Sequence, residues 1–157
     1  LETSPEYDGN SIKLRDIIVS EEKVPQEFFL KPESLESWNY LKGAKNEKRL
    51  NKKNGFSYEY SEGKMVFPDS LDFPSRTIVT GEGGSSPSRF KHVIKTESGK
   101  LRRLTPVELE RLNMFPDNHT KEGSDIERAF LMGNALVVGL IERVGKSIAG
   151  AIENTSP

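Results

Sequence analysis

The chain has 157 residues, a formal net charge of -1 and 34% hydrophobic residues, enough for one domain with a modest core. It contains no cysteine, which excludes disulfides, thiolate metal sites and a thiol nucleophile within the chain. Its two histidines, His92 and His119, are too far apart to suggest a metal site. No apolar run could span a bilayer and no secretory pattern is present, so we expect a cytoplasmic protein.

Charge is unevenly distributed along the chain. Residues 1–41 contain nine acidic and four basic residues, whereas residues 42–53 and residues 85–103 each contain six basic residues and one acidic residue. Local basic clusters matter more than net charge when the partner is a phosphate backbone. A cluster of this kind by itself is more often a solvated basic face, so both interpretations stay open at this point.

One short helix is predicted in the first part of the chain. Residues 1–10 are polar and should form a loop, and residues 12–18 fit either a short helix or a strand. Residues 34–41 place three apolar side chains at helical spacing. Among them, Trp38 is more typical of a core anchor than of a residue that stacks on a base.

The middle of the chain has the pattern of a β-rich unit. Residues 42–54 lack apolar periodicity, so we expect an exposed loop there. Strands are predicted at residues 56–60, 65–67, 76–80 and 89–94, with turns between them.

A loop at residues 81–86 holds three glycines in four positions, which let the backbone adopt positive φ and approach a partner closely. It is not a phosphate-binding P-loop, because no Gly-Lys-Ser/Thr sequence follows. A plain hairpin connection would also accommodate these glycines.

The last third of the chain carries start signals for three helices. Thr105 and Glu108 fit a capping box, and this helix should stop near Met114, because Phe115 precedes a proline. A second capping box, at residues 124–127, should start a helix that ends at a glycine six residues later.

The third helix is predicted over residues 135–149, with Asn134 as its N-cap. Its apolar residues fall on one stripe, made of Val137, Ile141, Val144 and Ile148 and widened by Leu136 and Leu140. The whole pattern predicts an α+β fold, with a small β-rich part at about residues 50–98 and helices at about residues 105–150.

Two blocks within these helices resemble motifs of the DNA cytosine-5 methyltransferases. The first is similar to the ninth motif of that family, roughly RxLTxxExxRLxxFP, and consists of Arg103, Leu104, Thr105, Glu108, Arg111, Leu112, Phe115 and Pro116. Gly133-Asn134-Ala135, followed by an apolar helix, resembles the tenth and last motif. The order and the short spacing of the two motifs match as well. An ordinary capped helical hairpin would account for the same residues outside the family.

The resemblance implies three parts and a DNA-binding role. Residues 1–41 would connect from the catalytic domain, residues 42–100 would form the target recognition domain, and residues 101–157 would form the ninth- and tenth-motif helices. Thr77 with the aliphatic residue after it resembles the marker of the recognition domain. The Gly-rich loop would then enter the major groove, where base edges differ in donors and acceptors. The implied DNA contacts, in which the basic members bind phosphates, are Arg76, Thr77, Gly83, Gly84, Ser85, Arg89 and Lys91.

The resemblance also implies part of an S-adenosyl-L-methionine site. Asn134, Ala135 and Leu136 would contact the methionine part of this cofactor. The ninth-motif residues that would order the recognition domain are Arg103, Thr105, Glu108, Arg111, Phe115 and Pro116. The chain has no Glu-Asn-Val-like or FxGxG-like block and no cysteine, so neither a catalytic residue nor a metal ligand is assigned in it.

The chain is therefore interpreted as the C-terminal, DNA-recognising portion of a DNA (cytosine-5-)-methyltransferase, as found in bacterial restriction–modification systems. It would be a cloned fragment or the small subunit of a split enzyme, and inactive alone. Its partners would be double-stranded DNA and the N-terminal catalytic domain or subunit, with no membrane involved. The alternative is a non-catalytic DNA-binding or protein-interaction module that shares only the helical hairpin.

Overall fold

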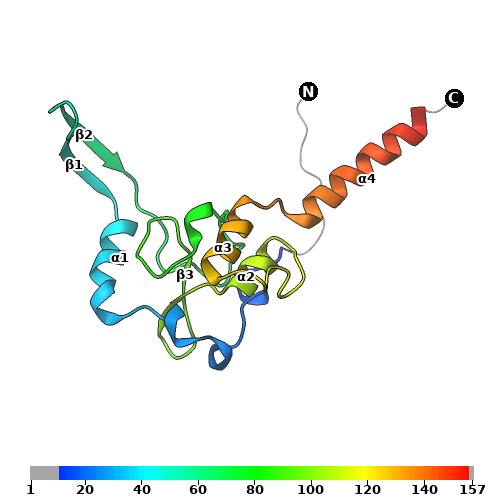
Figure 1. The fold of residues 1–157 in the computed structure, drawn as a ribbon, viewed down its shortest axis with the longest axis horizontal. Coiled ribbons are helices and arrows are strands. Elements are labelled where there is room, and N and C mark those ends of the chain that lie inside the picture. Colours follow the sequence, from blue (N-terminus) through cyan, green and yellow to red (C-terminus); the bar gives the residue numbers. More distant parts are fainter. Residues whose placement is uncertain (1–10, 156–157) are drawn as a thin grey trace.

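A computed structural model describes residues 11–155, in which four α-helices and four short β-strands are joined by turns and loops (Figure 1). The helices are α1 (Leu35–Lys42), α2 (Pro106–Leu112), α3 (Asp125–Asn134) and α4 (Val138–Thr155). The strands are β1 (Lys45–Leu50), β2 (Ser57–Glu62), β3 (Val93–Lys95) and β4 (Leu101–Arg103). The 3-10 turns are Leu14–Asp16, Glu21–Lys23, Gln26–Phe28, Pro32–Ser34 and Thr80–Glu82. This mixture confirms the α+β prediction, while the loop predicted for residues 1–10 lies outside the described residues.

The strands form two separate antiparallel pairs. β1 pairs with β2 from Lys45 opposite Glu62 to Leu50 opposite Ser57, which makes a long hairpin. β3 pairs with β4 over three residues near the middle of the body (Figure 1). The two pairs do not join into one sheet in the described part of the chain, so the body depends on its helices and loops for a core.

The hydrophobic core lies between α2, α3, the β3–β4 pair and the first residues of the described chain. Its buried members are Leu14, Ile78, Ile94, Leu104, Leu109, Ala129 and Met132. The amide of Leu14 donates to the carbonyl of Phe73 at 2.9 Å, so the N-terminal segment is also hydrogen-bonded to the middle of the chain.

The predicted starts of α2 and α3 are confirmed. The Thr105 hydroxyl accepts a hydrogen bond from the Glu108 amide at 3.4 Å, and the Glu108 carboxylate accepts one from the Thr105 amide at 2.6 Å. Ser124 and Glu127 form the same reciprocal pair at the start of α3. The helix predicted at residues 34–41 is confirmed as α1, in which Trp38 is only 1% exposed and so is a core anchor.

The loop prediction for residues 42–54 is wrong over residues 45–50, which form β1. Both faces of this hairpin are largely open to water, so its sequence lacks the apolar alternation that marks a half-buried strand. The strands predicted at residues 65–67 and 76–80 are absent from the described structure, and the predicted strand 89–94 is reduced to β3. Instead of joining a sheet, the amide of Met65 donates to the Lys42 carbonyl at 2.8 Å.

The boundary between α3 and α4 also differs from the prediction. Asn134 is the last residue of α3 rather than the cap of the next helix, and α4 begins at Val138 after an extended stretch. Gly133 lies inside α3, where a Cβ would sit 2.5 Å from the backbone nitrogen of Thr80. This glycine therefore allows α3 to touch the backbone before the Gly-rich loop, instead of ending the helix.

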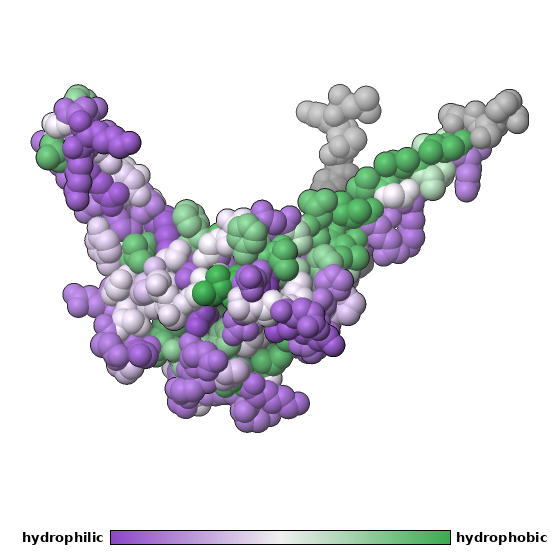
Figure 2. All heavy atoms as spheres, in the orientation of Figure 1, coloured by the Kyte–Doolittle hydropathy of each residue, from purple (hydrophilic) through white to green (hydrophobic). Residues whose placement is uncertain are grey.

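Two elements project from the body, the β1–β2 hairpin and α4 (Figure 1). Figure 2 shows a mainly hydrophilic hairpin and a continuous hydrophobic face along α4. None of the helices within residues 11–155 is long and apolar enough to cross a membrane.

Candidate nucleic-acid interface

A buried ion pair lies at the centre of the ninth-motif block. The two terminal nitrogens of Arg102 donate to the two carboxylate oxygens of Glu108 at 2.9 and 2.7 Å, and these side chains are 1% and 0% exposed. Glu108 also accepts from the amide and hydroxyl of Thr105 and from the amide of Val19 at 2.9 Å. These bonds stabilise two charged groups that are removed from water. Since Glu108 lies in α2, Arg102 in β4 and Val19 in the N-terminal segment, the bonds also hold these three parts together.

Arg103, the arginine that the sequence analysis assigned to the ninth motif, does not take part in this ion pair. Its guanidinium donates to the carbonyls of Gly84 at 2.8 Å and Glu27 at 2.7 Å, and it lies 4.9 Å from the ring centre of Phe28. Burial lowers its pKa from the ordinary value. Arg103 thus ties the Gly-rich loop to the N-terminal segment. Sequence reasoning missed Arg102, although the first position of the pattern RxLTxxE coincides with it.

The end of the motif closes the loop between α2 and α3. Arg111 donates to both oxygens of Asp117, at 2.7 and 2.6 Å, and to the carbonyl of Ile17 at 2.9 Å. Phe115 packs against the core, whereas Pro116 is exposed.

A second buried carboxylate, Glu110, was not singled out from the sequence. It is 0% exposed and accepts from Arg128 at 3.0 Å and from the amides of Thr120 and Asn118. Burial alone would raise the pKa of Glu110, but hydrogen bonds from Thr120 and Arg128 leave it below the ordinary value. The block is thus an internal frame made of charged groups.

The glycines of the Gly-rich loop serve close packing and backbone shape. A Cβ on Gly83 would lie 3.0 Å from the Cα of Ile126 in α3, so a side chain there would push the loop away from the helix. Gly84 has a φ of +77°, a conformation that glycine adopts without steric cost. The loop is therefore seated on α3 and leaves Gly81, Ser85 and Ser86 exposed.

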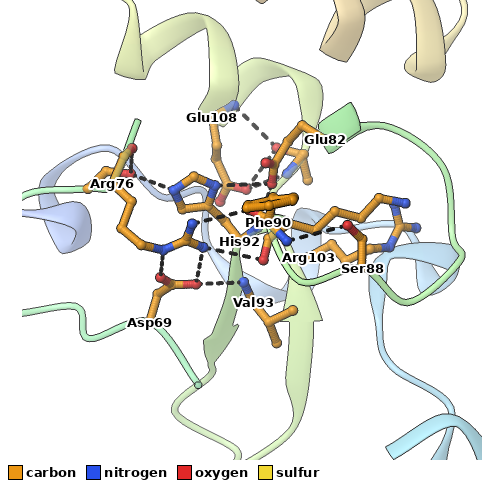
Figure 3. A network of polar contacts seen from close by, with 12 residues as sticks. Asp69, Arg76, Glu82, Ser88, Phe90, His92, Val93, Arg103 and Glu108 are labelled. Carbon is orange, nitrogen blue, oxygen red and sulfur yellow. Dashed lines mark hydrogen bonds and ion pairs between the residues drawn. The ribbon is translucent and has the colours of Figure 1, made fainter. Parts of the chain in front are cut away.

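Two of the basic residues predicted to bind phosphates make internal hydrogen bonds at this loop. The Lys91 ammonium donates to the carbonyls of Gly84 at 2.9 Å and Ser86 at 2.8 Å, and burial lowers its pKa. Arg76 pairs with both carboxylate oxygens of Asp69 at 2.6 and 3.1 Å and also reaches the carbonyl of Phe90 at 3.1 Å (Figure 3). Both side chains stiffen the segment that presents the loop.

Arg89, the third predicted basic contact, lies at the base of the hairpin. It pairs with Glu62 at 3.1 Å and donates to the carbonyls of Leu41 and Gly63. The exposed members of the predicted DNA-contact set are Thr77 and Ser85, and the exposed ring of Phe90, 52% accessible, is a neighbour that sequence reasoning missed.

His92 and Glu82 form a buried polar pair behind the loop (Figure 3). The Glu82 carboxylate accepts from the His92 amide at 2.6 Å and faces the ring Nδ1 at 3.1 Å, while the ring Nε2 lies 3.0 Å from the Ser75 hydroxyl. This pair connects the 3-10 turn of the loop to β3, so the loop is fixed at both ends.

The tenth-motif segment begins against the backbone just before the Gly-rich loop, where Gly133 meets Thr80, and continues along an apolar groove. Residues 74–78 and residues 135–137 both line this groove. The Asn134 amide group donates to the carbonyl of Phe130 at 2.8 Å, and Leu136 is 65% exposed. The buried Asn113 holds the segment in place, since it donates to the Met132 carbonyl at 2.7 Å and accepts from the Val138 amide at 2.9 Å.

The two motif blocks and the Gly-rich loop are joined by one internal frame, and comparison with known proteins identifies the family of the chain. Residues 3–150 match the model of the C-5 cytosine-specific DNA methylases, so the chain belongs to this family, which confirms the resemblance.

The curated relatives are larger than this chain. It is 46% identical over 149 residues to type II methyltransferase M.Sau3AI of Staphylococcus aureus, a match that covers 94% of the chain and 34% of the relative. It is 27% identical over 151 residues to type II methyltransferase M.HpaII of Haemophilus parainfluenzae, covering 87% of the chain and 38% of the relative. The chain therefore spans about a third of the length of the relatives it matches. No solved structure matches it.

Proposed function

We propose that this chain is the C-terminal, DNA-recognising portion of a DNA (cytosine-5-)-methyltransferase of a bacterial restriction–modification system. In this proposal residues 1–41 connect from the catalytic domain, residues 42–100 recognise the target and residues 101–157 complete the fold of the enzyme. The family match and the two ordered motifs support this division, as does the match to about a third of each relative.

The observation that carries the proposal is the uncovered apolar stripe of α4. Its residues Ile141, Val144, Ile148 and Ile152 are 44 to 61% exposed, and the helix extends away from the body (Figures 1 and 2). A continuous exposed apolar face of this length marks a surface that another surface covers. We assign the covering surface to the Rossmann-like catalytic domain of the same enzyme.

The target recognition proposal uses the exposed side of the Gly-rich loop. Ser85 on this side of the loop, and Thr77 in the segment before the loop, carry exposed hydroxyls that can donate to or accept from base edges. Lys91 bonds to two carbonyls of the loop and Arg76 bonds to the Phe90 carbonyl in the segment after it, so their first role is to present the loop in one shape. Arg89 does the same for the base of the hairpin. Gly83 lets the loop pack closely on α3, and Gly84 gives its backbone a positive φ.

The cofactor proposal concerns Asn134, Ala135 and Leu136. S-adenosyl-L-methionine, when bound, supplies the methyl group that is transferred to carbon 5 of cytosine. Ala135, which has an extended backbone, and the exposed Leu136 fit a share of such a site because they line the groove, while the side-chain nitrogen of Asn134 is engaged by its own helix. Without the rest of the enzyme this segment forms only one side of the cofactor site, so the chain alone should bind S-adenosyl-L-methionine weakly.

The chain by itself should not transfer a methyl group. Carbon 5 of cytosine becomes nucleophilic when a thiolate adds to carbon 6, and this chain has no cysteine to supply the thiolate. The test is a tritiated methyl-transfer assay on duplex DNA with the chain alone, with the remainder of the enzyme alone and with both. Transfer by the pair only is expected. Transfer by the chain alone would refute the assignment, as would a folded and bound pair that is inactive.

A further inference from the structure

The β1–β2 hairpin has a charge distribution that the recognition loop does not explain. Its distal half, residues 49–58, contains Arg49, Lys52 and Lys53 and no acidic residue. All three acids of the hairpin, at positions 47, 59 and 62, lie in the half that joins the body. The arm is therefore basic at the end that points away from the protein (Figure 1).

Contacts on one face hold the arm in shape. The Arg49 guanidinium lies 3.5 Å from the ring centre of Tyr60 and donates to Glu47 at 2.6 Å. Lys45 pairs with Glu62 at 2.9 Å in the next rung. A two-stranded hairpin alone is marginally stable in water, so these contacts explain how the arm stays extended beyond the body.

The turn at the tip is ordered as well, and it presents its cations outward. The Asn51 amide donates to the Phe56 carbonyl at 2.8 Å, and the Asn51 side chain accepts from the Lys53 amide at 3.0 Å. Lys52, Lys53 and Phe56 are exposed, the last at 65%. Within residues 11–155, neither tip lysine lies in an ion pair, unlike Arg49 and Lys45 lower on the arm.

We propose that the hairpin is a second DNA-contacting element, in which Lys52 and Lys53 bind backbone phosphates of the duplex beside the target. This inference rests on the proposed function, because it takes duplex DNA as the substrate. A six-residue strand extends about 20 Å, which equals roughly six base pairs of B-DNA. A two-stranded ribbon fits the major groove, and a rigid arm whose tip lysines lie in no ion pair suits a contact that positions the duplex.

Salt dependence of binding tests the proposal with the full chain and a 30-base-pair duplex, followed by fluorescence anisotropy. Lys52→Ala/Lys53→Ala should reduce the slope of log affinity against log salt by about two. Lys23→Ala/Lys31→Ala removes the same charge at two exposed positions elsewhere and should leave the slope unchanged. An equal slope for the tip variant and the wild type would overturn the hairpin contact and leave the proposed function standing. No binding by the wild type even at about 20 mM salt would overturn both.

Photo-crosslinking gives a second readout that does not depend on affinity. Because the chain has no cysteine, Ser57→Cys beside the tip accepts a single thiol-linked aryl azide. Glu122→Cys, at a side chain that is 92% exposed in the loop before α3, is the matched control. Crosslinks to DNA from position 57 and few from position 122 are expected. Equal yields, or none from position 57 while the chain is bound, would overturn the proposal.

Discussion

Ile148 in the apolar stripe of α4 offers the sharpest mutational test of how this chain joins the rest of its enzyme. We predict that Ile148→Asp weakens that association strongly while the body of the chain stays folded. The residue projects on a helix beyond the core, so a carboxylate there faces water in the free chain. In the assembled enzyme the same carboxylate would be covered by an apolar surface.

The expected loss follows from the exposure of the side chain. Ile148 is 56% exposed, so covering it removes about half of an isoleucine from water. Complete burial contributes about 1.5–3 kcal/mol, so this half contributes about 1 kcal/mol. Dehydrating a carboxylate without a partner costs at least about 2 kcal/mol more. The dissociation constant should therefore rise about 100-fold.

The assay is a binding titration against the Staphylococcus aureus relative from which the matched third has been removed. Ala149→Asp is the control, because it adds the same carboxylate one residue along the helix and about 100° around its axis, at an exposed position on the side of Glu142 and Lys146. The control should change the dissociation constant little. An unchanged constant for Ile148→Asp, or an equal loss in both variants, would refute the assignment of this stripe to the interface.

Three further predictions concern the chain itself. In urea unfolding, Arg102→Met should lower the free energy of unfolding by about 3–5 kcal/mol, because the buried carboxylate of Glu108 loses its partner. Lys146→Met, at an exposed ion pair, should lower it by less than about 0.5 kcal/mol. Gly133→Ala should cost about 1–3 kcal/mol of stability, since its Cβ would lie 2.5 Å from backbone, whereas Gly145→Ala, with open space around it, should raise the melting temperature. Burial lowers the pKa of Lys42 to about 8, so the unfolded chain holds more protons between pH 8 and 10.5. Stability relative to Lys42→Met should therefore rise with pH across that window.

Each of these predictions has an outcome that contradicts it. Similar urea midpoints for Arg102→Met and the wild type would show that the pair contributes no net stability. A stable Gly133→Ala variant would mean that α3 does not touch the backbone before the loop. A difference between wild type and Lys42→Met that stays constant from pH 8 to 10.5 would show that Lys42 is not desolvated.

The sequence predicted the starts of α2 and α3 because a capping box is a local device. The side chain of Thr105 or Ser124 and the carboxylate three residues later satisfy each other's backbone groups whatever surrounds them. The buried pair of Arg102 with Glu108 was missed, because charge and spacing alone do not tell a desolvated pair from a solvated one.

The parts that sequence reasoning missed depend on contacts between distant segments. Residues 45–50 form a strand that is stabilised by contacts between polar side chains, such as Arg49 with the ring of Tyr60. Because these contacts do not need apolar residues, the sequence shows no alternation of apolar and polar residues there. Gly83 indicated close backbone approach, but the sequence could not tell DNA from α3 as its neighbour, and Gly133 was predicted to end α3 instead of packing against the backbone of Thr80. Likewise, the positive charge of Lys91 did not predict that its ammonium would be turned inward to the carbonyls of its own loop.

Methyl transfer by a chimera tests the central claim most directly. The third of the Staphylococcus aureus relative that matches this chain, at 46% identity, is replaced by the chain, and tritiated methyl incorporation into duplex DNA is measured. The relative lacking that third is the control and should be inactive. We predict that this chain restores incorporation to the folded chimera. A folded chimera that binds DNA and yet transfers no methyl group above the control would contradict it.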